Sequence, residues 1–173
     1  MANISSTFGS VVITAQTSAK AKAICKALDS ILNGNFDYYT DFSIDTGVEK
    51  DNFFRCSFVG TGRWAYIYSL EDLGRNLDYF KRFDEHAEAI KVIEENDFTL
   101  DVEFTDEEGG NAFIMQCDGV IEHKANTPVS ELVFVESNRT DYEYTRENLK
   151  LLCGYDDCDL DDMFADYEED EAC

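Results

Sequence analysis

Apolar and polar positions along the chain recur with the periods of strands and helices. The run FGSVVITAQ, from Phe8 to Gln16, is rich in β-branched residues and typical of a buried strand. Thr17 or Ser18 can then cap a helix, and Gly34 would end it. The apolar residues of this helix share one face through their i, i+3, i+4, i+7 and i+8 spacing: Ile24, Ala27, Leu28, Ile31 and Leu32.

Later segments predict further strands and helices. A turn near Gly47 joins the second strand to the third, and Gly119 bends the fifth. The strands expected after the first helix are 36–44, 52–60, 97–105, 112–123 and 131–136. Ser69 is expected to cap a second helix, which has Leu70, Leu73, Leu77 and Phe80 on one side. Two further helices are expected over 84–95 and over 140–153, and the last of these ends at Gly154.

The segment from Asp97 to Thr105 alternates most strictly. The apolar side chains that point one way are Phe98, Leu100, Val102 and Phe104. The polar side chains that point the other way are Asp97, Thr99, Asp101 and Glu103. Three further acids, Asp106, Glu107 and Glu108, lead into a turn at Gly109-Gly110-Asn111. We therefore expect a hairpin that carries carboxylates on one face and at its turn.

The order of these elements predicts an α+β fold. It begins β-α-β-β-α-β, which resembles a ferredoxin-like antiparallel sheet with helices on one face. An extra β-hairpin and an acidic C-terminal helix would extend it. We expect residues 1–154 to form a single α+β domain and residues 155–173 to form an acidic amphipathic segment.

Composition and charge exclude several classes of protein and of binding partner. The chain has 173 residues, 44% of them hydrophobic, with a single proline, so a disordered chain is excluded. The formal net charge of -23 argues against direct binding to nucleic acid or to an anionic membrane, because phosphates repel it. No membrane-spanning run or secretory signal is visible in the sequence, and we expect a cytoplasmic protein.

Candidate chemistry is sparse. Six scattered cysteines and two histidines show no metal-ligand spacing, and the chain has no phosphate loop, dinucleotide fingerprint or nucleophile elbow. We therefore expect no enzyme, no cofactor and no metal site. Two alternatives stay open. Asp157, Asp159, Asp161 and Glu168 match part of a calcium loop, although Asp162 replaces its glycine. Asp101 and Glu103 could form the carboxylate pair of a metal-dependent enzyme.

The acids are concentrated in the later part of the chain. Residues 1–28 contain no acid, whereas residues 155–173 contain ten acids and no base. No lysine or arginine lies between Asp97 and Gln116. This distribution favours a localised acidic surface over a general adaptation for solubility.

The C-terminal segment combines this charge with a helical apolar stripe at Leu160, Met163, Phe164 and Tyr167. The stripe could pack on the domain, enter a groove of a partner, or stay disordered. Asp156 and Asp157 lie where carboxylates favour a helix N-terminus. The candidate partner-binding residues of the whole chain are Asp97, Asp101, Glu103, Asp106, Glu107, Glu108, Asp156, Asp157, Asp159, Asp161, Asp162, Asp166, Glu168 and Glu169.

In size, acidity and absence of catalytic motifs, the chain resembles the anti-defence proteins of phages and mobile elements, such as anti-CRISPR and DNA-mimic inhibitors. The resemblance implies an inhibitor that occupies the basic nucleic-acid-binding groove of a nuclease effector, for example a Cas protein. The alternative is a non-enzymatic adaptor or assembly protein, whose aromatic residues or C-terminal stripe would make the contact.

Overall fold

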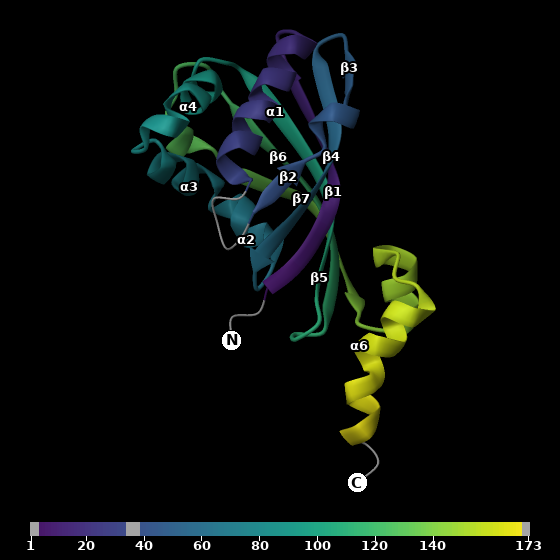
Figure 1. Ribbon diagram of the computed structural model, residues 1–173. Helices are drawn as coiled ribbons and strands as arrows, with labels where there is room; N and C mark the ends of the chain where they lie inside the picture. The colour runs from purple at the N-terminus through teal and green to yellow at the C-terminus, as the bar shows by residue number, and fades with distance from the viewer. Residues whose placement is uncertain (1–3, 34–38, 171–173) are drawn as a thin grey trace.

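An antiparallel seven-stranded sheet forms the centre of the molecule (Figure 1). The computed structural model describes residues 4–33 and 39–170, with side chains up to residue 164. The strands are β1 (Ile4–Ala15), β2 (Thr40–Phe42), β3 (Val48–Lys50), β4 (Phe53–Arg63), β5 (Phe98–Glu108), β6 (Phe113–His123) and β7 (Phe134–Glu143). The main helices are α1 (Ser18–Leu32), α2 (Tyr66–Glu71), α3 (Leu73–Phe80), α4 (Ala87–Glu94), α5 (Arg146–Asn148) and α6 (Asp157–Asp170).

The sheet order is β2-β4-β1-β5-β6-β7, and β3 also pairs with β4. β1 and β2 both run antiparallel to β4, so the α1 crossover connects two parallel strands that are not neighbours. α2 to α4 make the equivalent crossover from β4 to β5 around β1. The predicted α+β fold with helices packed on the sheet is confirmed, and the strand order is compatible with the ferredoxin-like arrangement. β6 and β7 extend the sheet beyond that arrangement.

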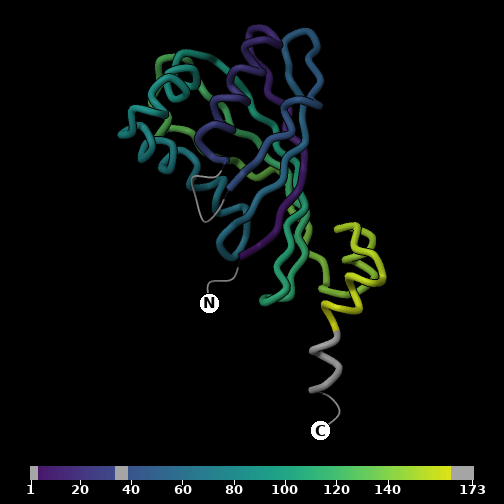
Figure 2. The backbone as a smooth tube through the Cα atoms, in the orientation of Figure 1, coloured from purple at the N-terminus to yellow at the C-terminus, as the bar shows by residue number. Residues whose placement is uncertain are grey.

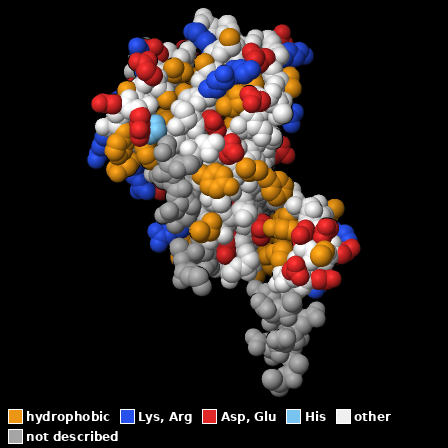
Figure 3. Space-filling view, in the orientation of Figure 1, with side chains coloured by type: hydrophobic (Ala, Val, Ile, Leu, Met, Phe, Trp, Pro, Cys, Tyr) orange, Lys and Arg blue, Asp and Glu red, His pale blue; other side chains and the backbone are white. Residues whose placement is uncertain are grey.

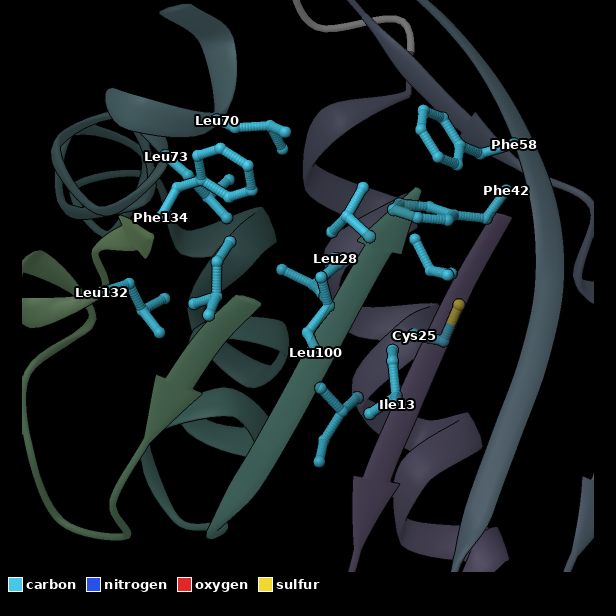
Figure 4. Packing of buried hydrophobic residues seen from close by; sticks show 14 of the residues in the cluster. Ile13, Cys25, Leu28, Phe42, Phe58, Leu70, Leu73, Leu100, Leu132 and Phe134 are labelled. Carbon is cyan, nitrogen blue, oxygen red and sulfur yellow. The ribbon is translucent and has the colours of Figure 1, made fainter. Parts of the chain in front are cut away.

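Helices α1 to α4 cover one face of the sheet and enclose the main core. Thr17 caps α1 and accepts a hydrogen bond from the Lys20 backbone N–H, as the sequence predicts. The predicted stripe of α1 faces inward, with Ile24 and Leu28 almost fully buried. Each such side chain contributes about 1.5–3 kcal/mol by leaving water. Figure 4 shows Leu28 and Leu100 between the side chains of α2 and α3 and those of β2 and β4.

A smaller C-terminal core lies on the opposite face. α5, a π-helical turn at Leu149–Cys153 and α6 pack there against β6 and β7, and Figure 2 shows this part beside the lower end of the sheet. Its buried residues are Ile114, Leu149 and Leu160. Gly154, with φ 77°, ends the π-helical turn where the sequence predicts an end. Of the three environments considered for the C-terminal stripe, packing on the domain is observed for Leu160, Met163 and Phe164, and the side chain of Tyr167 lies outside the described part.

Several predicted boundaries were wrong. Ser69 lies inside α2 and caps nothing, because α2 begins at Tyr66. Residues 140–143 belong to β7 and not to a helix, because they pair with β6. The strand expected over 36–44 is limited to Thr40–Phe42 in the described part, since 34–38 lie outside it. Next to Gly119, where a bend is expected, the register between β6 and β7 shifts by one residue, and the extra residue is Ser137 of β7. The pairing of β6 with β5 continues through Gly119 without a shift. None of the helices in the described ranges combines the length and apolar character needed to cross a membrane.

Candidate functional site

Four carboxylates project from two paired strands on the face of the sheet opposite α1 to α4. Asp101 and Glu103 are exposed on β5, where they alternate with the buried Leu100 and Val102. β6 adds two residues of the same orientation, the half-buried Asp118 and the exposed Glu122. We call Asp101, Glu103, Asp118 and Glu122 the acidic sheet face.

The register of the two strands brings these carboxylates together. Glu103 lies directly opposite Asp118, and Glu122 lies opposite Thr99. Like charges at opposed positions are unfavourable, and β5 and β6 contain no lysine or arginine that would compensate them. Asn138 on β7 donates its amide to both carboxylate oxygens of Asp118, at 3.2 and 3.1 Å. The arrangement therefore concentrates negative charge without an ion pair on either strand.

A shallow groove of about 580 Å³ runs across this face from β4 to β7. Glu103 and Asp118 line it, together with hydroxyl and amide groups and the exposed Phe8 and Val59. Arg139 also lines it and is paired with Asp141 at 2.9 Å. The groove can thus offer carboxylates and hydrogen-bonding groups beside a small apolar area. This combination is suited to contact with a cationic surface of another macromolecule.

The prediction that Asp106, Glu107 and Glu108 belong to an exposed acidic surface was wrong. β5 continues through all three residues, and each is buried. They are covered because α2 reaches this end of the sheet on one face while the C-terminal core covers the other. They are consequently not part of an accessible surface.

Each of these buried acids has a local structural partner. Asp106 accepts hydrogen bonds from the Thr7 hydroxyl at 2.7 Å and from the Tyr66 backbone N–H at 2.6 Å. Burial raises the pKa of Asp106 to about 6, against the lowering effect of these hydrogen bonds. Burial also raises the pKa of Glu107, which accepts a hydrogen bond from the Tyr155 hydroxyl at 2.8 Å. Glu108 accepts from the backbone N–H of Gly110 and holds the turn of the hairpin.

The C-terminal acids lie on the same face of the sheet, since α6 packs beyond Ile114 of β6. Figure 3 shows carboxylates gathered over this unit. Asp156 caps α6 by accepting from the backbone N–H groups of Cys158 and Asp159, as its position predicts. Asp159 and Asp162 are exposed. This unit therefore continues the negative charge of the acidic sheet face.

Two further acids of α6 are partly neutralised by cations of the preceding turn. Asp157 contacts Lys150 at 2.7 Å, and Asp161 contacts Arg146 at 2.5 Å. The hydrogen bond from Lys150 lowers the pKa of Asp157. Such exposed ion pairs are weak, so a competing cation can replace them. The predicted residues Asp166, Glu168 and Glu169 belong to α6, but their side chains lie outside the described part.

The remaining candidates are Asp97 and the residues of the possible metal sites. Asp97 is exposed just before β5 and accepts a hydrogen bond from the Ala125 backbone N–H. The calcium-loop alternative was wrong, because Asp157, Asp159 and Asp161 lie in a helix and not in a loop. Within the described ranges, no three histidine, cysteine or acidic residues are placed to hold a metal ion.

Sequence reasoning missed Asp118 and Glu122. The signal was present, because Gln116, Asp118, Val120 and Glu122 alternate with the apolar residues of the returning strand. The pairing of the hairpin then places them beside the predicted Asp101 and Glu103.

The chain matches no family model, and comparisons with curated proteins and with solved structures give no significant match.

Proposed function

We propose that this chain is a non-enzymatic inhibitor whose acidic sheet face occupies the basic nucleic-acid-binding groove of a nuclease effector, in the manner of anti-CRISPR and DNA-mimic proteins. The observation that carries the proposal is the set of four carboxylates on β5 and β6, which no cation of either strand compensates. The exposed acids of α6 extend the same negative surface.

The spacing of the carboxylates supports mimicry of phosphates. Same-face residues such as Asp101 and Glu103 are about 6.6 Å apart along a strand, and neighbouring strands are about 4.8 Å apart. These separations are comparable to those of phosphates along a nucleic acid. A groove lined by arginine and lysine would therefore meet charges at intervals similar to those of its normal ligand.

The alternative of an adaptor that binds through its C-terminal stripe has less support. Leu160 is buried in the C-terminal core, and Met163 and Phe164 pack against the same core. A partner could reach this stripe only after α6 had left the domain. The acidic sheet face, in contrast, is accessible without any rearrangement.

The test replaces the acidic sheet face by neutral residues of equal size: Asp101→Asn, Glu103→Gln, Asp118→Asn and Glu122→Gln. We expect the variant to lose inhibition of DNA cleavage in a panel of purified Cas nucleases that the unmodified chain inhibits. Its affinity for the same nucleases, measured by interferometry, should also depend much less on salt between about 50 and about 200 mM than the affinity of the unmodified chain does.

A matched control removes the same charge from the other side of the molecule: Asp78→Asn, Asp84→Asn, Glu88→Gln and Glu95→Gln. These residues are exposed on or near α3 and α4. The control should inhibit as the unmodified chain does. Equal behaviour of the two variants, or absence of inhibition by the unmodified chain across the panel, would contradict the proposal.

A further inference from the structure

A second concave site lies on the helical side of the sheet, away from the acidic sheet face. A half-open cavity of about 520 Å³ lies between the sheet, α1, α2 and α3. Its apolar lining includes Val11, Leu28, Phe42, Phe58, Leu100 and Val102. Figure 4 shows Leu28 and Phe42 on one side of Leu100 and Leu70 and Leu73 on the other. The volume falls within the range of about 300–1,000 Å³ that is typical of small-molecule sites.

Two arginines and one acid, Asp72, are the charged residues of the lining, in contrast to the excess of acids in the chain as a whole. Arg63 and Arg75 both line the cavity, although the chain has only 14 lysines and arginines against 37 acids. Arg75 is paired with Asp72 at 2.5 Å. Among the residues that the structure describes, no carboxylate forms an ion pair with Arg63.

Trp64 lies on the same rim in an unusual conformation. Its φ of 70° is in the left-handed region, which is costly for a large side chain, and 48% of its surface is exposed. Strained residues of this kind are frequent where a ligand is held. Trp64 is the chain's single tryptophan, so its fluorescence reports on this rim alone.

One long-range hydrogen bond and one close local approach keep the strained turn in place. The buried Asp106 accepts a hydrogen bond from the backbone N–H of Tyr66, two residues after Trp64. Gly62 permits the close approach, because a Cβ atom there would lie 2.5 Å from the Cα atom of Tyr66. The rim is thus anchored to β4 and β5, as a preformed binding site requires.

We propose that this cavity binds a small amphipathic monocarboxylate, with its hydrocarbon body in the apolar cavity and its carboxylate at Arg63. An apolar lining with a few placed polar groups fits such a ligand, and a guanidinium binds carboxylate in two-point geometry. This site is independent of the acidic sheet face and of the inhibitory function proposed for it.

The test titrates the full chain with dodecanoate and follows Trp64 fluorescence and calorimetric heat. We expect saturable binding below about 1 mM. Dodecanol, which has the same body without the charge, should bind at least about tenfold more weakly, because the charged hydrogen bond at Arg63 is absent.

Two variants distinguish the loss of the Arg63 contact from the loss of a positive charge elsewhere on the chain. Arg63→Gln should weaken dodecanoate binding about tenfold or more. Arg55→Gln, at an exposed position of the same strand that does not line the cavity, should leave it unchanged. Both substitutions are at exposed positions, and thermal unfolding will verify that the variants fold. No saturable binding, equal affinity for dodecanol, or equal affinities of the two variants would overturn the proposal.

Discussion

Asp106 connects three separate parts of the chain through one buried carboxylate. One oxygen accepts from Thr7 on β1, and the other accepts from the backbone of Tyr66 at the start of α2. The Thr7 hydroxyl also lies 3.2 Å from the carbonyl oxygen of Thr105. The sequence shows the charge of Asp106 but not which elements cover it. A residue expected to bind a partner therefore proves to link β1, β5 and α2 inside the fold. Burial of this kind arises from tertiary packing and leaves no local pattern.

The raised pKa of Asp106 predicts how stability depends on pH. Its pKa rises from 3.8 to about 6, so the folded state holds the proton more tightly than the unfolded state does. This contribution is fully present below the unfolded pKa and is lost as pH rises through about 6. At about 1.36 kcal/mol per pKa unit, the ionised carboxylate costs up to about 3 kcal/mol at pH 7. The free energy of unfolding should therefore increase on acidification from pH 7 to pH 5.

Asp106→Asn should remove this cost. The amide can donate to Thr7, whose hydroxyl can in turn donate to the Thr105 carbonyl, while the amide oxygen accepts from Tyr66. We expect the variant to be about 1–3 kcal/mol more stable than the unmodified chain at pH 8, and similar to it near pH 4. Urea unfolding at both pH values measures this. Asp101→Asn, at an exposed site of the same strand, is the control; a less stable Asp106→Asn at pH 8 would refute the assignment.

At the scale of elements, strands with alternating burial were predictable, whereas of β7 only the start, within the predicted strand 131–136, was predicted and its polar part was not. β5 alternates because one face packs on the core, so Phe98 to Phe104 reveal it directly. β7 is almost wholly exposed between Val135 and Glu143, and its sequence ESNRTDYE shows no apolar period. It forms because its backbone pairs with β6 at the edge of the sheet. The start of α2 is similarly set by the distant Asp106, so a local cap at Ser69 was the wrong signal.

The C-terminal core should behave as a separate unit of low stability, since only three of its residues are fully buried in the described part. Leu160→Ala removes one of them and should cost about 2–5 kcal/mol locally. We expect faster amide hydrogen exchange over residues 145–164, while exchange in β1 and β4 stays unchanged. Leu151→Ala is the control, because 76% of that side chain is already exposed. Equal protection in the two variants would show that α6 is not held by its apolar stripe.

At the scale of the whole molecule, negative charge accumulates on one side of the sheet. β5, β6 and the C-terminal unit carry acidic side chains on the same face, whereas the first strand and helix, up to residue 28, carry no acid. The regional imbalance is visible in the sequence. Its concentration on a face depends on the β5–β6 register, because only that register places Asp118 beside Glu103. The cavity between the sheet and α1 to α3 was not predictable, because it depends on the spacing of these helices where they pack on the sheet.

The net charge of -23 predicts that self-repulsion opposes folding at neutral pH. Screening should relieve it, so the free energy of unfolding at pH 7 should rise between about 10 mM and about 0.5 M NaCl, as the Debye length falls from about 30 Å to below 10 Å. The gain should be smaller at pH 5, where part of the carboxylates are protonated. Calcium or magnesium chloride at a matched low ionic strength distinguishes screening from a specific site. Saturable stabilisation by either cation, at concentrations where sodium has no effect, would restore the metal-binding alternative; a uniform dependence on ionic strength would support a surface built for electrostatic contact.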